Sequence, residues 1–151
     1  MPHRMARIPV RDTAPELAFR GILSRLQSGP VRTNDPALPG TPDVVLPERK
    51  VAGFVHGCFW HHHPGCRHAR VPATSYPWES KFARTRRRDV VSRAELLGAG
   101  WRVVTVWECA LLGGTAVPRD TLDARLRAFL DSAEPALEVA GEDVGGEPGP
   151  A

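Results

Sequence analysis

The sequence of 151 residues lacks any run of about 18 apolar residues, the length that a membrane-spanning helix needs. The basic N-terminal stretch MPHRMARIPV is not followed by the apolar segment of a secretory signal. No internal repeat is present. These absences, with a length typical of a single domain, predict a soluble, intracellular protein with one hydrophobic core.

Cysteine is scarce. The chain has three cysteines, and an odd number does not suit a framework of intrachain disulfides. A reducing cytoplasm would disfavour disulfides as well. Because several histidines accompany these thiols, the sequence favours a metal site instead.

Basic residues are absent from the last twenty positions, 132–151, which hold five acidic residues and are rich in Gly, Pro and Ala. We interpret 132–151 as a disordered acidic tail. Residues 1–131 then carry 20 basic and 12 acidic side chains, a formal charge of +8 against +3 for the whole chain. So basic a domain is expected to bind a polyanion, above all nucleic acid; a solvated basic surface is the alternative.

Helix-like and strand-like segments alternate along the domain. Thr13 and Glu16 make a Thr-x-x-Glu capping box with Pro15 in the first turn, which predicts a helix that stops at Gly29-Pro30. The apolar patterns then predict strands at 43–46 and 51–55, a helix over 77–98, a strand over 101–107 and a helix over 119–132. This order predicts an α/β domain.

The segment HGCFWHHHPGC, residues 56–66, holds four histidines and two cysteines. Zinc prefers tetrahedral sets of Cys and His ligands. Cys58, His63 and Cys66 supply three candidates, and Cys109, just past the third predicted strand, supplies a fourth. The alternative is that the cysteines are small buried apolar residues and the histidines a flexible tract.

Other polar residues suggest reactive chemistry. His56 and His61 lie outside the proposed zinc set, and histidine can take a proton from water or hold a phosphate oxygen. Asp43 opens a strand in GTPDVVLP and is a candidate for Mg²⁺, which prefers oxygen ligands. A Pro-Asp ahead of such a strand is the layout of many metal-dependent nucleases, but Pro-Asp also commonly starts turns.

Phe59 and Trp60 are neighbours in the same loop, so at least one of the two rings is expected to be exposed. An exposed ring can enter a base step and kink duplex DNA; Trp78 is a further candidate, and core packing is the alternative for each. The helix over 77–98 presents Lys81, Thr85 and Arg88 on one face. A basic face suits contacts with phosphates, although most charge runs are solvated surface.

Ordered motifs from about residue 5 to about residue 112 resemble the very-short-patch-repair (Vsr) DNA mismatch endonuclease family. They are MARIPVRDTAPEL, LPGTPDVVLP, FVHGCFWHHH with its later Cys, VPAT, WESKFARTRRRD and GWRVVTVWECAL. The resemblance implies a restriction-endonuclease-like α/β fold, with a PD-(D/E)XK-type core, a central mixed sheet flanked by helices and a structural zinc site. It implies Mg²⁺-dependent nicking of one strand 5′ to the thymine of a T:G mismatch, the lesion that deamination of 5-methylcytosine leaves.

The resemblance also implies roles for residues of this chain. Asp43 would bind Mg²⁺ with the backbone carbonyl of Val55, His61 would act as general base, His56 would be a second active-site histidine, and Glu16 would act through water. The implied zinc ligands are Cys58, His63, Cys66 and Cys109. The interval from Cys58 to Cys66 is one residue longer than in the family, so His62 stays an alternative to His63. The implied wedge into DNA is Phe59, Trp60 and Trp78; Thr85 stands where the family has asparagine.

The implied substrate is double-stranded DNA with a T:G mismatch, bound by a cytoplasmic, nucleoid-associated monomer of bacterial type, with mismatch-repair proteins as candidate partners. One alternative is a related nicking or restriction-type nuclease of a restriction–modification system. Another is a zinc-stabilised DNA-binding module without cleavage, which would leave Asp43, His56 and His61 without a role. A catalytic zinc hydrolase would need an open coordination position, which four ligands close.

Overall fold

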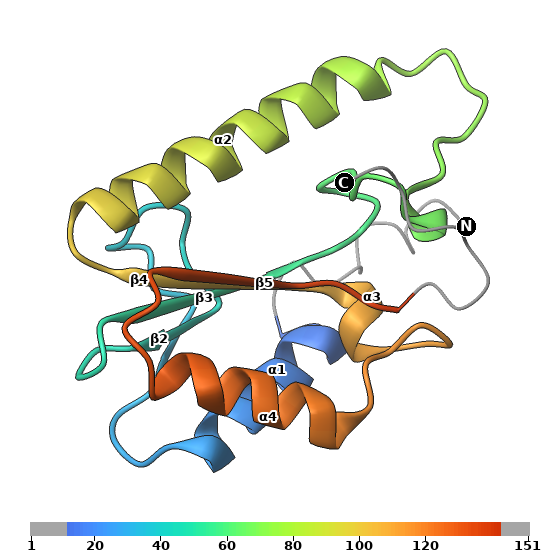
Figure 1. The fold of residues 1–151 in the computed structure, drawn as a ribbon. Helices are drawn as coiled ribbons and strands as arrows, with labels where there is room; N and C mark the ends of the chain where they lie inside the picture. The colour runs from blue at the N-terminus through green and yellow to red at the C-terminus, as the bar shows by residue number, and fades with distance from the viewer. Residues whose placement is uncertain (1–11, 143–151) are drawn as a thin grey trace.

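The structure is a computed structural model that describes residues 12–142 (Figure 1). Its elements in chain order are α1 Ala14–Leu26, β1 Arg32–Thr33, β2 Val44–Leu46, β3 Val51–His56, η2 Arg67–Ala69, α2 Trp78–Gly98, β4 Arg102–Trp107, α3 Glu108–Leu111, α4 Arg119–Leu130 and β5 Ala136–Val139. The five strands form one mixed sheet in sequence order, antiparallel from β1 to β3 and parallel from β3 to β5. The predicted α/β class and the predicted elements are confirmed, with boundaries shifted by a few residues at most.

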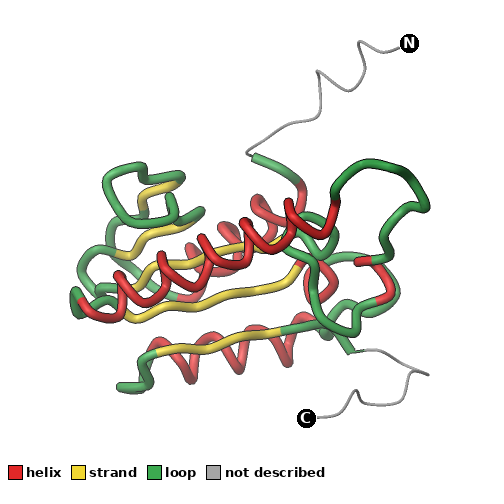
Figure 2. The backbone as a smooth tube through the Cα atoms, turned by 90° about the horizontal axis from the view of Figure 1, so that it is seen from above, coloured by secondary structure: helices red, strands yellow, loops and turns green. Residues whose placement is uncertain are grey.

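The two faces of the sheet are covered unequally. Helices α1 and α4 cover one face, where most of the buried apolar residues gather in one cluster around Phe19 and Leu126. Helix α2 lies over the other face, lengthwise above the strands (Figure 2). Only Phe82 and Leu96, near the two ends of α2, are buried. The middle of α2 therefore does not seal the sheet.

The interpretation of 132–151 as a disordered tail is wrong for the part that the structure describes. Residues 136–139 form β5, which pairs in parallel with 103–106 of β4. Leu137 and Val139 alternate onto the covered face and join the main core, which is the period-two pattern of a strand. The acidic, Gly- and Pro-rich composition hid this short pattern. Residues 143–151 lie outside the described residues.

The capping box at the start of α1 also needs correction. Thr13 is the N-cap residue and has extended backbone angles, but its side chain makes no capping hydrogen bond. The Glu16 carboxylate instead accepts the backbone N–H of Asp12, at 2.7 Å. Glu16 is 8% exposed, so its carboxylate is fixed at the helix start on the side that faces the sheet edge.

Candidate active site and metal cluster

The middle of α2 and the open face of the sheet enclose a cleft of about 490 Å³. Side chains alternate along a strand, so residues between those packed on α1 and α4 face α2. The side chains that line the cleft include Glu16, Asp43, His56, His61, Asp89 and Trp107. The fold thus brings together the four predicted catalytic residues, which come from α1, the position before β2, the end of β3 and the following turn.

Asp43 lies immediately before β2, where the pairing of β2 with β3 ends at Val44. Its Oδ2 accepts the N–H of Val55 at 2.7 Å, taking the place of a strand partner. Burial, together with nearby Glu16, raises the pKa of the Asp43 carboxyl to about 6, against the opposing effects of the Val55 N–H, Arg20 and His61. The ionised form of Asp43 is therefore destabilised in the folded protein, and a bound cation would reduce this destabilisation.

His56 and His61 stack in parallel, with ring centroids 3.9 Å apart and 3° between the planes. Both face Asp89 in the middle of α2. Nδ1 of His61 lies 2.6 Å from Oδ2 of Asp89, and Nε2 of His56 lies 3.9 Å from Oδ1. Burial and the adjacent His61 together lower the pKa of His56 to about 4, against the opposing effect of Asp89. His56 is therefore neutral near pH 7, while His61 is the histidine with a carboxylate in hydrogen-bond range.

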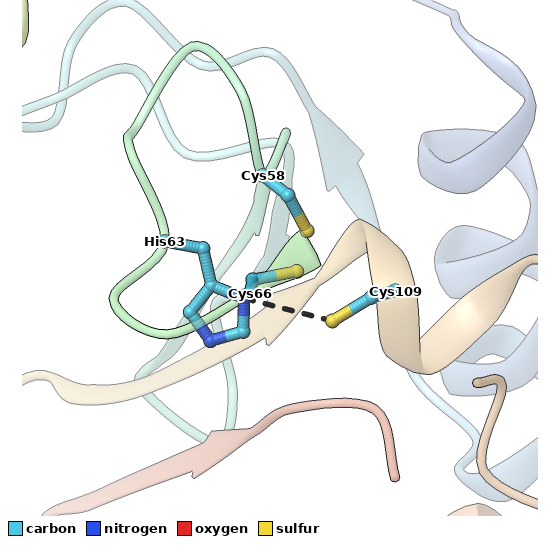
Figure 3. Close-up of side chains that lie close together, drawn as sticks. All are labelled: Cys58, His63, Cys66 and Cys109. Atoms are coloured by element: carbon cyan, nitrogen blue, oxygen red, sulfur yellow. Dashed lines mark hydrogen bonds between the residues drawn. The ribbon is translucent and has the colours of Figure 1, made fainter. Parts of the chain in front are cut away.

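Four predicted zinc ligands converge at the ends of β3 and β4 (Figure 3). Their ligand atoms all lie within 4.8 Å of one another, in the set Cys58, His63, Cys66 and Cys109. Nδ1 of His63 is 3.6 Å from Sγ of Cys109, close to the edge of about 3.5 Å expected between N and S ligands of a tetrahedral zinc ion. All three cysteines are free thiols. The donor set and its spacing therefore fit zinc.

The proton balance of the cluster also suits a metal. Cys109 accepts a hydrogen bond from the Cys58 thiol, and this bond, with further ones from His63 and the Gly141 N–H, lowers the pKa of Cys109. The same bond, with burial, raises the pKa of the Cys58 thiol. The N–H of Gly141 lies 3.2 Å from Sγ of Cys109. Backbone N–H groups of this kind orient and stabilise metal-bound thiolates.

His62 is directed away from the cluster, although it is next to His63 in sequence. Its ring stacks on Phe82 of α2, with centroids 4.6 Å apart. His62 has φ 47°, a left-handed conformation that turns the chain between the two histidines. His63 stacks instead on Trp107, with centroids 4.0 Å apart. The structure therefore groups His63, rather than His62, with the cysteines.

The aromatic residues of the loop pack against α2 but leave one ring in solvent. Phe59 makes edge-to-face contacts with Trp60, Trp78 and Phe82, at centroid distances of 5.0 to 5.4 Å. Trp60 is 52% exposed, which confirms the prediction that at least one of the adjacent rings faces solvent. Lys81 lies over the Trp60 ring, with its Nζ 5.7 Å from the centroid.

The predicted DNA-binding face of α2 is only partly assembled as expected. Lys81 accompanies Trp60, and Thr85 is half-buried. Arg88 instead belongs to an outer arginine patch with Arg84 and Arg87. The arginines that line the cleft are Arg86 and Arg93, which the sequence pattern did not single out.

Known proteins resemble this chain over most of its length. A family model described as DNA mismatch endonuclease Vsr matches residues 2–67. DNA mismatch endonuclease Vsr of Escherichia coli (strain K12) is 40% identical over 127 residues, which cover 83% of this chain and 80% of that protein. The chain belongs to the Vsr family. Type II nicking enzyme V.XorIIP of Xanthomonas oryzae pv. oryzae is 41% identical over 128 residues, 84% of this chain and 89% of that protein. Type II nicking enzyme V.NaeI of Lentzea aerocolonigenes is 39% identical over 129 residues, which cover 81% of this chain and 76% of that protein.

Membership of the Vsr family makes this chain a DNA endonuclease. The relatives' names divide between a mismatch endonuclease and type II nicking enzymes, so the family does not by itself fix the DNA site that is cut. No helix within residues 12–142 is both long and apolar enough to cross a membrane.

Two residues beside the Vsr-family cleft escaped the sequence reading. Asp89 stands in the basic run KFARTRRRD and looks like one more charge of a solvated face, and no spacing within that run points it to the cleft. Arg20 lies 2.9 Å from the Asp12 carboxylate and 3.8 Å from Glu16. Arg20 lies one helical turn after Glu16, on the same face of α1.

Proposed function

We propose that this protein is a Mg²⁺-dependent endonuclease that nicks one DNA strand 5′ to the thymine of a T:G mismatch and so starts very short patch repair. The observation that carries this proposal is the single cleft in which Asp43 faces the hydrogen-bonded pair of His61 and Asp89. The residue before His61 is the exposed Trp60. The proposed general base His61 and the candidate DNA wedge Trp60 are therefore neighbours in one loop. The 40% identity to a DNA mismatch endonuclease supports the choice of substrate.

The fit of magnesium rests on Asp43. Its half-buried carboxylate has a pKa raised to about 6 and offers the hard oxygen ligand that Mg²⁺ prefers. We assign the Val55 carbonyl as its partner ligand and Glu16 to the water shell. When bound, Mg²⁺ polarises the phosphodiester and stabilises the leaving 3′ oxygen. The core is proposed to be of PD-(D/E)XK type, with Phe54, Val55 and His56 near the positions where an acid and a lysine usually follow.

The chain itself supplies the proton transfer. With Asp89 ionised, Nδ1 of His61 donates to it at 2.6 Å, which leaves Nε2 as the nitrogen that can take a proton from the attacking water. Asp89 also stabilises the imidazolium that results. His56 stays neutral and stacks against His61, holding the ring in place. The zinc cluster takes no part in this chemistry and is proposed to be structural.

Replacing Asp89 by Asn should lower kcat for nicking about a hundredfold, because a neutral amide cannot stabilise the His61 imidazolium. Affinity for DNA should not fall, since the change removes a negative charge from the cleft. Single-turnover nicking and DNA titration separate the two quantities. Glu95→Gln, the same loss of charge at an exposed position of α2, is the control and should change neither.

Replacing Trp60 by Ala should weaken binding to mismatched DNA about tenfold or more, since base–aromatic stacking is worth about 1–3 kcal/mol. Thermal stability should hardly change, because the ring is half in solvent. Leu17, an apolar residue of α1 with the same exposed fraction of 52%, provides the matched control Leu17→Ala. Equal affinity of Trp60→Ala and the parent protein for a T:G duplex would rule out Trp60 as a wedge.

The decisive assay compares strand-labelled T:G, C:G and T:A duplexes in which the bases flanking the central pair are randomised, with Mg²⁺ or with EDTA. Randomised flanks prevent an unsuitable sequence context from hiding the activity. We expect a nick only in the T:G duplex, beside the mismatched thymine, and only when Mg²⁺ is present. Sequencing of the nicked strands then gives the preferred context.

A second candidate is a nuclease that nicks a particular unmodified or mismatched site in a restriction–modification setting. The observation in its favour is the similarity to type II nicking enzymes, at 41% and 39% identity. In the same assay it would nick fully paired duplexes of one sequence. Binding of every duplex without a nick would instead favour a DNA-binding module.

A further inference from the structure

A second cluster of metal-ligating side chains lies in the cleft, separate from the cysteines. Ligand atoms of His56, His61 and Asp89 lie within 4.8 Å of one another. The three residues come from the end of β3, the turn after it and the middle of α2. They are held by different elements, so their convergence is a property of the fold rather than of one flexible segment.

The ligand atoms of this histidine–aspartate cluster gather around one carboxylate. The parallel rings of His56 and His61 both present a nitrogen to the Asp89 carboxylate. The two nitrogen–oxygen separations are 2.6 and 3.9 Å. They bracket the edge of about 3.3 Å that N and O ligands form around a tetrahedral ion at zinc distances. Because the rings are parallel and stacked, their in-plane lone pairs do not yet converge, so binding an ion also requires the His56 and His61 rings to rotate out of the stack.

The ligand types select the ion. Imidazole nitrogen suits zinc, cobalt, nickel and copper, whereas Mg²⁺ prefers an all-oxygen shell. Two histidines and one carboxylate that leave a position open are a common site for such metals. Here the side chains are 13%, 24% and 27% exposed and line the cleft, so water or a phosphate oxygen can complete the shell.

We propose that His56, His61 and Asp89 form a binding site for a borderline-soft divalent cation such as Zn²⁺ or Co²⁺, and that its occupancy inhibits nicking. The ion takes the place of the proton between Nδ1 of His61 and Asp89. A neutral His61 then carries its proton on Nε2, so this nitrogen can no longer accept a proton from the attacking water. Free zinc would thereby switch off the enzyme at a site other than the cysteine cluster. The inhibition rests on the proposed function, but the binding of the ion does not.

The test is a Co²⁺ titration, without DNA, of protein whose cysteine cluster is already loaded with zinc. One further equivalent should bind and give visible d–d absorption without the near-ultraviolet thiolate band that replacement in the cysteine cluster would produce. His61→Ala and Asp89→Ala should each weaken this binding about tenfold or more, because each loses one of three ligands. Asp43→Asn should keep it. His68→Ala, which removes an exposed histidine of the neighbouring turn, is the matched control and should also keep it.

Absence of the extra equivalent would overturn the proposal. So would binding that survives both His61→Ala and Asp89→Ala in protein that retains its zinc and its thermal transition. In the nicking assay, micromolar Zn²⁺ should inhibit at saturating Mg²⁺, and a tenfold increase in Mg²⁺ should not relieve it. Co²⁺ binding in a protein that nicks no duplex would refute the proposed function and leave the metal site standing.

Discussion

Asp43→Asn is expected to reduce nicking about a thousandfold or more and, at neutral pH, to make the protein more stable. The loss of activity follows because the proposed Mg²⁺ ligand is gone, and a bound metal contributes several kcal/mol to the transition state. The gain in stability follows because burial raises the pKa of the Asp43 carboxyl to about 6. The amide oxygen of Asn can still accept the N–H of Val55.

The pH dependence has a defined sign. An unfolded Asp has a pKa near 3.9, so between about pH 4 and pH 6 the unfolded chain releases its proton first and the folded state loses stability as pH rises. Above about pH 6 the penalty is constant, at about 1–3 kcal/mol. Asp43→Asn removes this penalty. Its advantage in free energy of unfolding should therefore be full at pH 7.5 and absent at pH 3.5, both without Mg²⁺.

Urea unfolding at the two pH values measures this difference. Asp131→Asn, the same change at an exposed position of the chain, is the control and should show no such pH-dependent gain. Addition of Mg²⁺ should stabilise the parent protein and leave Asp43→Asn unaffected. A variant that is less stable than the parent at pH 7.5, or one that still nicks at the parent rate, would contradict the assignment of Asp43.

The sequence was most informative where chemistry is local. The ligand-rich segment 56–66 revealed its cysteines and histidines directly, and the apolar patterns placed the helices and the longer strands. What local patterns could not show is which neighbour turns inward. His62 and His63 are chemically identical, and only the left-handed backbone at His62 decides that His63 joins the cysteines.

Residues whose role depends on distant elements were the ones missed. Asp89 gains its role only when α2 crosses the sheet above His61, and nothing within the basic run KFARTRRRD indicates that contact. Strand β5 is four residues long and lies in a segment of acidic, Gly- and Pro-rich composition, so its partner β4 provides the order that its own sequence does not predict. Glu138, on β5, consequently lines the cleft without having been considered.

His63→Ala is expected to release zinc, lower the thermal midpoint by at least about 10 °C and abolish nicking. Structural zinc contributes several kcal/mol to folding, and this cluster joins the loop after β3 to α3 and to Gly141, two residues past β5. His62→Ala is the matched control, because it alters the neighbouring histidine and should leave the zinc content unchanged. Elemental analysis and thermal unfolding measure both effects. Zinc lost from His62→Ala and kept by His63→Ala would reverse the assignment.

His63→Cys separates the two proposed roles of His63, ligation of zinc and stacking on Trp107. A fourth thiolate can still complete a tetrahedral zinc site, so zinc should stay bound and most of the stability should be retained. The ring that stacks on Trp107 is lost, however, and Trp107 in turn contacts His56 edge-on, with centroids 5.2 Å apart. Nicking should therefore fall several-fold in His63→Cys although its zinc is present. Full activity would show that zinc orders the loop without help from the stack, and that Trp107 does not connect the metal cluster to the catalytic histidines.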